Sequence, residues 1–132
     1  MELQVGVKII LQNKEGKFLL LQRNLEKYPE VGAKWDIVGG RINPGLPLLE
    51  NLKREVSEEA GLEVVGEPKL LLAQDILKID KHVVRLTYVG EAEGEVKLSE
   101  EHSRYLWLTR DELYGIEPMD KYIKELLDKK LI

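Results

Sequence analysis

This chain of 132 residues has a formal net charge of −4, and its 43% hydrophobic and 33% charged residues are typical of one soluble globular domain over residues 1–132. The acidic balance argues against nonspecific nucleic-acid binding, the absence of cysteine excludes disulfides and thiol catalysis, and two histidines are too few for a typical zinc site. No apolar run approaches the roughly 18 residues of a membrane span and no secretory pattern opens the sequence, so we expect a cytoplasmic protein without membrane contact.

The N-terminal part of the chain predicts strands joined by turns. Apolar and polar residues alternate over 5–11, which is the period of a half-buried strand. A turn over 13–16 and a more buried strand over 17–22 complete a hairpin. A loop over 23–34 follows, long enough for a binding role or for a plain connection, and then a short strand over 35–38.

The short strand leads into two adjacent glycines, Gly39 and Gly40. Without side chains, their backbone groups can approach a ligand closely. Trp35 fits core packing better than base stacking, and both roles stay open. Arg23 is the first residue of the long loop. We take Arg23, Trp35 and Gly39 as candidate substrate-binding residues.

The segment beyond the glycines predicts a helix with one acidic side. Glu55, Glu58 and Glu59 are spaced i, i+3, i+4, so they project within an arc of about 100°. The buried stripe of the same helix is apolar and consists of Leu48, Leu49, Leu52, Val56 and Ala60. Glu59 lies about 20° from two of these residues on a helical wheel. It therefore stands at the border of the core, where a carboxylate is costly unless it is paired or binds a metal.

The acidic side has two interpretations. One is a solvated surface on which Arg54 bridges Glu50 and Glu58 at i−4 and i+4. The other is a cation site, because like charges at this spacing repel by a few tenths of a kcal/mol per pair and no lysine stands between the three carboxylates. The residues that flank the helix favour the second interpretation, as described below.

The C-terminal half predicts further strands and two short helices. Strands are expected over 62–65, 69–79, 82–91 and 105–108, with a turn at 66–68 between the first two. An acidic loop or hairpin is expected over 93–101. Thr109 and Glu112 have the spacing of a capping box, and Pro118 is expected to start a closing helix. Strands and helices interleave, which favours an α/β (α+β) fold with a mixed sheet between helices.

The segment from Gly40 to Leu62 resembles the Nudix box, G-x5-E-x7-R-E-U-x-E-E-x-G-U, in which U is a bulky aliphatic residue. The matching residues are Gly40, Arg54, Glu55, Val56, Glu58, Glu59, Gly61 and Leu62. At roughly 7% usage per residue type, six identities in register arise by chance about once in 10^7 registers. Two positions depart from the pattern. Leu46 replaces the first box glutamate, and Val38 stands where relatives often carry proline.

The resemblance implies the Nudix fold, an α/β/α sandwich, and metal-dependent hydrolysis of a phosphoanhydride bond. It implies that Glu55, Glu58 and Glu59 hold the metals together with the backbone carbonyl of Gly40, while Arg54 orients a glutamate by a salt bridge. Hard oxygen ligands select Mg2+, with Mn2+ as a substitute. In the family the first box glutamate is a supporting residue, so Leu46 is expected to affect the rate more than the reaction.

The catalytic base has two candidate locations, because relatives take it either from the box or from a glutamate in a later loop. Glu58 and Glu59 are expected to be indispensable in either case. In the later loop Glu100 and Glu101 are candidates, and we take Glu101 as the catalytic one; the alternative for both is a plain exposed acidic loop. His102 beside them can contact substrate or simply lie on the surface, and the surface position is the one expected.

The substrate class follows only by elimination. Relatives that act on ADP-ribose often carry a proline beyond the box, where this chain has Ile76 and Leu77, and relatives that act on diadenosine polyphosphates often carry a tyrosine where Lys78 and Ile79 stand. The upstream signature of the coenzyme A subgroup is also absent. The LLLQR run is similar to the nucleotide-sanitising branch, which favours nucleoside triphosphates or oxidised nucleotides. ADP-ribose and dinucleoside polyphosphates stay as alternatives.

A function of another class is a Nudix-like domain that senses nucleotides without cleaving them. The departures at Leu46 and Val38 are its only support, and such proteins usually lose a later glutamate or the arginine, all of which are present here. Homodimerisation is common among relatives and is allowed by the resemblance.

Overall fold

A computed structural model describes residues 1–32 and 34–132. Seven strands of this part of the chain form one sheet: β1 (Glu2–Gln12), β2 (Phe18–Arg23), β3 (Trp35–Asp36), β4 (Val38–Arg41), β5 (Glu63–Leu77), β6 (Lys81–Glu93) and β7 (His102–Leu108). The order is β3-β2-β1-β6-β5, with β4 paired to β1 and β7 paired to β2. The sheet is mixed, because β1 and β6 run parallel whereas the other pairs are antiparallel.

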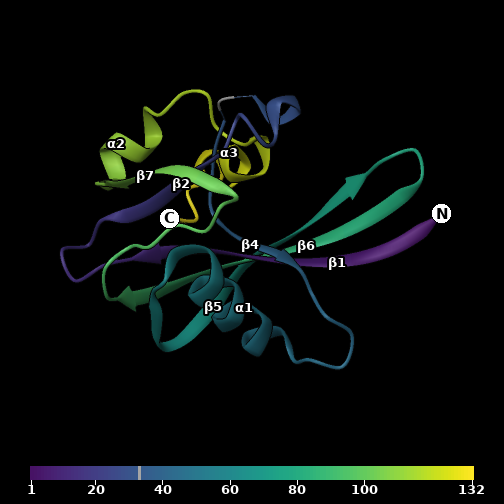
Figure 1. The fold of residues 1–132 in the computed structure, drawn as a ribbon, viewed down its shortest axis with the longest axis horizontal. Helices are drawn as coiled ribbons and strands as arrows, with labels where there is room; N and C mark the ends of the chain where they lie inside the picture. Colours follow the sequence, from purple (N-terminus) through teal and green to yellow (C-terminus); the bar gives the residue numbers. More distant parts are fainter. Residues whose placement is uncertain (33) are drawn as a thin grey trace.

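Helices cover both faces of this sheet (Figure 1). They are α1 (Leu48–Ala60) on one face and α2 (Arg110–Tyr114) with α3 (Lys121–Asp128) on the other; a short 3-10 helix, Pro29–Val31, lies in the long loop. In the described residues, no helix is long and apolar enough to cross a lipid bilayer.

Two hydrophobic cores form because β1 and β2 are apolar on both sides. Alternate residues of these strands enter different cores, as the period of a strand requires. The core below α1 includes Val7, Ile9, Leu11, Leu19, Leu21, Leu52 and Val56. The core below α2 and α3 includes Ile10, Phe18, Leu20, Leu113, Ile123 and Leu126. This arrangement confirms the expected α/β/α sandwich and its mixed sheet.

Strand β5 corrects the prediction of two strands separated by a turn. It is continuous over 15 residues, and its pairing with β6 shifts register between Val65 and Lys69. Gly66 has a φ of +73°, which suits a bulge that bends a strand while its pairing continues. The turn signal at 66–68 thus marks a bulge within one strand.

Several other boundaries differ from the predictions, among them that of β7, which begins at His102 rather than at 105. The expected strand over 35–38 is split, because Ile37 separates β3, which pairs with β2, from β4, which pairs with β1. The closing helix begins at Lys121 rather than at Pro118, since the Asp120 side chain caps it by accepting two backbone N–H groups at 3.1 Å. The N-terminal hairpin and the Thr109 capping box are confirmed.

Candidate active site

Helix α1 packs on β4, and this contact brings two glutamates to the adjacent glycines. Glu59 is only 5% exposed, and its Oε2 accepts a hydrogen bond from the Gly39 N–H at 3.0 Å. Glu55 lies against the next residue, since a Cβ added at Gly40 would stand 3.0 Å from Glu55 Oε1. The position of Glu59 at the border of the core, expected from the helical wheel, is confirmed.

The carboxyl groups of Glu55 and Glu59 are close enough to influence each other. Burial, followed by a hydrogen bond with Glu55, raises the pKa of Glu59 to about 8, although Lys8 and the Gly39 N–H act in the opposite direction. Burial and the neighbouring carboxyl group both favour the protonated form of Glu59. A bound cation can displace such a proton.

Arg54 lies between the box glutamates and contacts two of them. One guanidinium nitrogen is 3.0 Å from Glu55 Oε1, and another is 3.1 Å from Glu58 Oε2. Glu58 is the outermost of the three carboxylates, with a side chain that is 61% exposed. Arg54 can therefore fix Glu55 at the edge of the core while Glu58 stays open to solvent.

The later loop reaches the same carboxylates from the other side. The Ser99 N–H donates to the Glu59 carbonyl at 3.2 Å, which ties the loop to the last turn of α1. One ligand atom each of Glu59, Glu101 and His102 lie within 4.8 Å of one another. Glu100, in contrast, has a side chain that is 93% exposed, and its carboxylate pairs with Lys27 at 3.8 Å. The structure thus brings Glu101 to the box and leaves Glu100 in solvent.

His102 corrects the expectation of a surface residue. It is 6% exposed and opens β7, where it pairs with Arg23 of β2. Burial, together with the positive charges of Arg23 and Lys8, lowers the pKa of His102 to about 4. The imidazole is therefore uncharged at neutral pH. The sequence gives no local sign of this burial, because charged and polar residues surround position 102.

The three candidate substrate-binding residues fall in different environments. Arg23 lies beside His102 at the site, and its guanidinium stacks 4.8 Å from the centre of the Tyr28 ring. Trp35 is 6% exposed in the core below α2 and α3, so packing accounts for its ring. The Gly39 N–H donates to Glu59, so it is not free to donate to a substrate.

A network of charged side chains from β1, β3, β6 and the cap of α3 lies beside the adjacent glycines of β4, where Lys8 pairs with Gly39. Lys8 Nζ lies 3.3 Å from Asp36 and donates to the Ile37 carbonyl at 3.1 Å. Arg85 lies 3.1 Å from Asp120 and 3.9 Å from Asp36. Burial alone would raise the pKa of Asp36, but Lys8 and Arg85 lower it. This network places a positive charge, that of Lys8, close to both Glu59 and His102.

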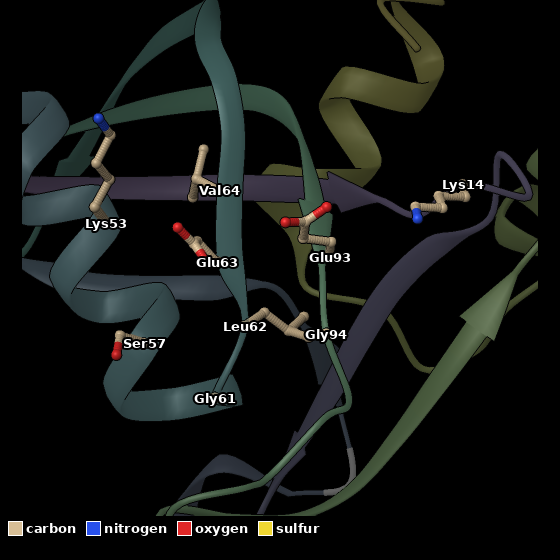
Figure 2. A pocket seen from close by; sticks show the side chains of 9 residues that line it. All are labelled: Lys14, Lys53, Ser57, Gly61, Leu62, Glu63, Val64, Glu93 and Gly94. Carbon is tan, nitrogen blue, oxygen red and sulfur yellow. The ribbon is translucent and has the colours of Figure 1, made fainter.

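Two cavities lie on different sides of α1. The first, of about 530 Å³, is lined by Lys27, Arg54, Glu55, Glu58, Glu59, Ser99, Glu100 and Glu101, and its volume is within the roughly 300–1,000 Å³ of small-molecule sites. The second is larger, about 760 Å³, and is shown in Figure 2 between α1, the start of β5 and the end of β6. Its rim carries Lys53 and Lys14 on opposite sides, and no box glutamate reaches it. The carboxylates of the box therefore line the smaller cavity.

Comparisons with known proteins agree with this geometry. The sequence matches the family model of the NUDIX domain over residues 2–129. The chain belongs to the Nudix family. It is 28% identical over 121 residues to a CTP pyrophosphohydrolase of Escherichia coli (strain K12), covering 88% of this chain and 85% of the relative. It is 30% identical over 99 residues to a protein assigned as 8-oxo-dGTP diphosphatase 2 in Mycobacterium tuberculosis, covering 70% and 67%. A crystal structure of a MutT protein from Methanosarcina mazei Go1 superimposes with a TM-score of 0.83 at 31% identity, covering 97% and 92%.

The donor set of this Nudix hydrolase fits a hard divalent cation. Nudix hydrolases cleave phosphoanhydride bonds, generally with divalent metals, and the side chains gathered at Gly40 supply oxygen donors. The contact between Glu55 and Glu59 supports this fit. Without a cation, a proton on Glu59 limits the repulsion between the two carboxyl groups, and a bound cation would take over that role.

Asn51 is a buried residue that contacts Arg54 of the box, and the sequence did not indicate it. Its side chain is fully buried, and Nδ2 donates to the Leu46 carbonyl at 2.7 Å and to the Pro47 carbonyl at 3.0 Å. Its Oδ1 accepts from the Asn43 N–H at 3.0 Å and from Arg54 at 3.2 Å. Asn51 thus fixes the turn that enters α1, where Leu46 replaces the expected box glutamate and provides no side-chain cap.

Replacing Asn51 with leucine is expected to destabilise the protein by about 1–3 kcal/mol, because the Asn43 N–H and the Leu46 carbonyl lose their partner. The free energy of unfolding in urea would measure this loss. Ser57→Ala, an exposed change on the same helix, serves as the control. An unchanged urea midpoint in Asn51→Leu would show that the turn does not depend on this side chain.

Proposed function

We propose that this Nudix hydrolase cleaves nucleoside triphosphates, oxidised ones included, to the monophosphate and pyrophosphate with bound Mg2+, or Mn2+ in its place. The convergence of Glu55, Glu58 and Glu59 at the wall of a cavity of about 530 Å³, with the Glu55 carboxylate against Gly40, supports the reaction type. The similarity to a CTP pyrophosphohydrolase over 88% of this chain supports the substrate class.

The residues of the box divide the work of holding the cation and aligning the substrate. Glu55, Glu58 and Glu59, with the Gly40 carbonyl, would hold the metal, which neutralises phosphate oxygens and lowers the pKa of a bound water. Arg54 keeps Glu55 and Glu58 in place through its two contacts near 3 Å.

Proton transfer and phosphate contact fall to residues around the box. Glu101 reaches the cavity from the later loop, where it can accept the proton of the attacking water. Arg23, at the edge of the site beside His102, offers a guanidinium to the phosphate chain of the substrate.

The closing test is product release from a panel of nucleoside triphosphates, oxidised nucleotides, ADP-ribose and dinucleoside polyphosphates, in Mg2+ and again with chelator. We expect monophosphate and pyrophosphate from a nucleoside triphosphate, and no product with chelator. Cleavage of ADP-ribose or a dinucleoside polyphosphate alone would replace the proposed substrate class. Nucleotide binding without any cleavage would identify a nucleotide sensor. The leucine at position 46, in place of the box glutamate, would then be the residue that distinguishes it from the active enzymes.

A further inference from the structure

Within the described residues, buried side-chain atoms without a hydrogen-bond partner belong to His102, Arg54 and Arg85. The two arginines have carboxylates at 3.0–3.1 Å from their guanidinium groups, so the imidazole of His102 is the group that lacks a close partner. The His102 side chain is 3% exposed, and within the described residues its Nδ1 forms no hydrogen bond. A buried polar group without a partner costs about 1–3 kcal/mol, so such groups are rare in native proteins. An unpaired nitrogen at this position therefore points to a ligand.

The unpaired nitrogen faces the carboxylates of the site. His102 Nδ1 lies 3.8 Å from Glu59 Oε1, which is too long for a hydrogen bond. Glu101 completes a group of three donor atoms that lie within 4.8 Å of one another. Metal bonds to nitrogen and oxygen are about 2.0–2.2 Å long, so two ligands of one ion stand at most about 4.4 Å apart. The three donors are thus within small side-chain adjustments of a single ion.

The backbone of the loop is already held in the required position. The Glu101 carbonyl accepts the Asn24 N–H at 2.8 Å, and the Ser99 N–H donates to the Glu59 carbonyl at 3.2 Å. His102 is anchored as the first residue of β7. Because these contacts fix the main chain, an ion needs to order only side chains.

We propose that Glu59, Glu101 and His102 form a second divalent-cation site beside the box, with His102 Nδ1 as a nitrogen ligand. The proposal deepens the proposed function and rests on it, because Glu59 belongs to both sites. Glu101 would bind the second ion through one carboxylate oxygen, and its other oxygen would accept the proton of the attacking water. A neutral imidazole presents a lone pair at one ring nitrogen, and the two carboxylates supply the charge that balances the ion.

A nitrogen ligand changes the choice of metal. Mg2+ keeps to oxygen ligands, whereas imidazole suits transition metals, and Mn2+ accepts both kinds of donor. The second site should therefore prefer Mn2+ to Mg2+, while the all-oxygen set at the box accepts either.

The chain has two histidines, so nitrogen ligation can be assigned without ambiguity. His82, the matched control, lies on β6 with its Nε2 2.7 Å from Asp75 and a side chain that is 33% exposed. Pulsed electron paramagnetic resonance of Mn2+ bound to the substrate-free full chain detects nitrogen directly bonded to the metal. We expect this nitrogen signal in the wild type and in His82→Gln, and its loss in His102→Gln.

Titration of Mn2+ gives a second readout. We expect His102→Gln to bind Mn2+ at least about tenfold more weakly, with a smaller change for Mg2+. A wild type without the nitrogen signal, or a signal that survives in His102→Gln or disappears in His82→Gln, would overturn the proposal. If His102→Gln does not fold, the wild type and His82→Gln decide the matter together. Since none of these measurements uses a nucleotide, they are independent of the hydrolysis assay.

Discussion

Glu59→Gln is expected to lower the rate of metal-dependent hydrolysis by a factor on the order of 10^2 or more. The change keeps the size of the side chain and an oxygen that can accept the Gly39 N–H, now bonded at 3.0 Å. It removes the negative charge that the cation needs between the box and the later loop. The loss should therefore appear in turnover while the fold is retained.

The same variant, which is expected to lose activity, is not expected to lose stability at high pH. Because the pKa of Glu59 is raised from 4.5 to about 8 in the folded protein, its contribution to stability is fully present below pH 4.5 and is lost as the pH rises through 8. Glutamine has no proton to lose. In chelator above pH 8, Glu59→Gln is thus expected to be at least as stable as the wild type.

Two measurements check these expectations. Turnover in Mg2+ gives the first, and thermal unfolding in chelator between pH 5 and 9 gives the second, with Glu63→Gln, an exposed change at the start of β5, as the control. Wild-type turnover in a folded Glu59→Gln variant would show that Glu59 is not needed for hydrolysis. If the unfolding temperature falls equally with rising pH in the wild type and in Glu59→Gln, the pH dependence comes from groups other than Glu59.

The sequence predicts the box side of the site because the signal there is local. Glu55 and Glu59 are one helical turn apart, and the apolar stripe of α1 determines which side of the helix faces the sheet. The alternation in β1 and β2 likewise shows both cores, since these strands are buried on both sides. These features depend on short-range periodicity, which a single sequence displays.

The other side of the site depends on pairing between distant segments. His102 is buried because β7 pairs with β2, bringing position 102 beside Arg23, and no pattern near residue 102 reports that pairing. The ion pairs of Lys8 with Asp36 and of Arg85 with Asp120 also join separate strands and a helix cap. Charged residues in predicted strands were the only available sign of such partners, since buried charges require them.

The last prediction concerns the adjacent glycines, whose roles the structure separates. Gly39 has a φ of +153°, and an added Cβ would overlap the Val7 carbonyl oxygen and lie 2.8 Å from Lys8 Cα, both backbone atoms of the central strand. Gly39→Ala is therefore expected to destabilise the protein by about 3 kcal/mol or more. At Gly40 the nearest atoms belong to the Glu55 carboxylate at 3.0 Å, which can move.

Gly40→Ala is accordingly the matched control, with the same added methyl group one residue away. It should keep most of the unfolding free energy and instead weaken Mg2+ binding, because the displaced Glu55 carboxylate is a proposed ligand. Urea unfolding and Mg2+ titration of both variants separate the two effects. Equal destabilisation of the two variants would contradict the prediction. It would mean that the β4 backbone can shift to accept a methyl group at Gly39, so that the close contact with β1 does not require glycine at this position.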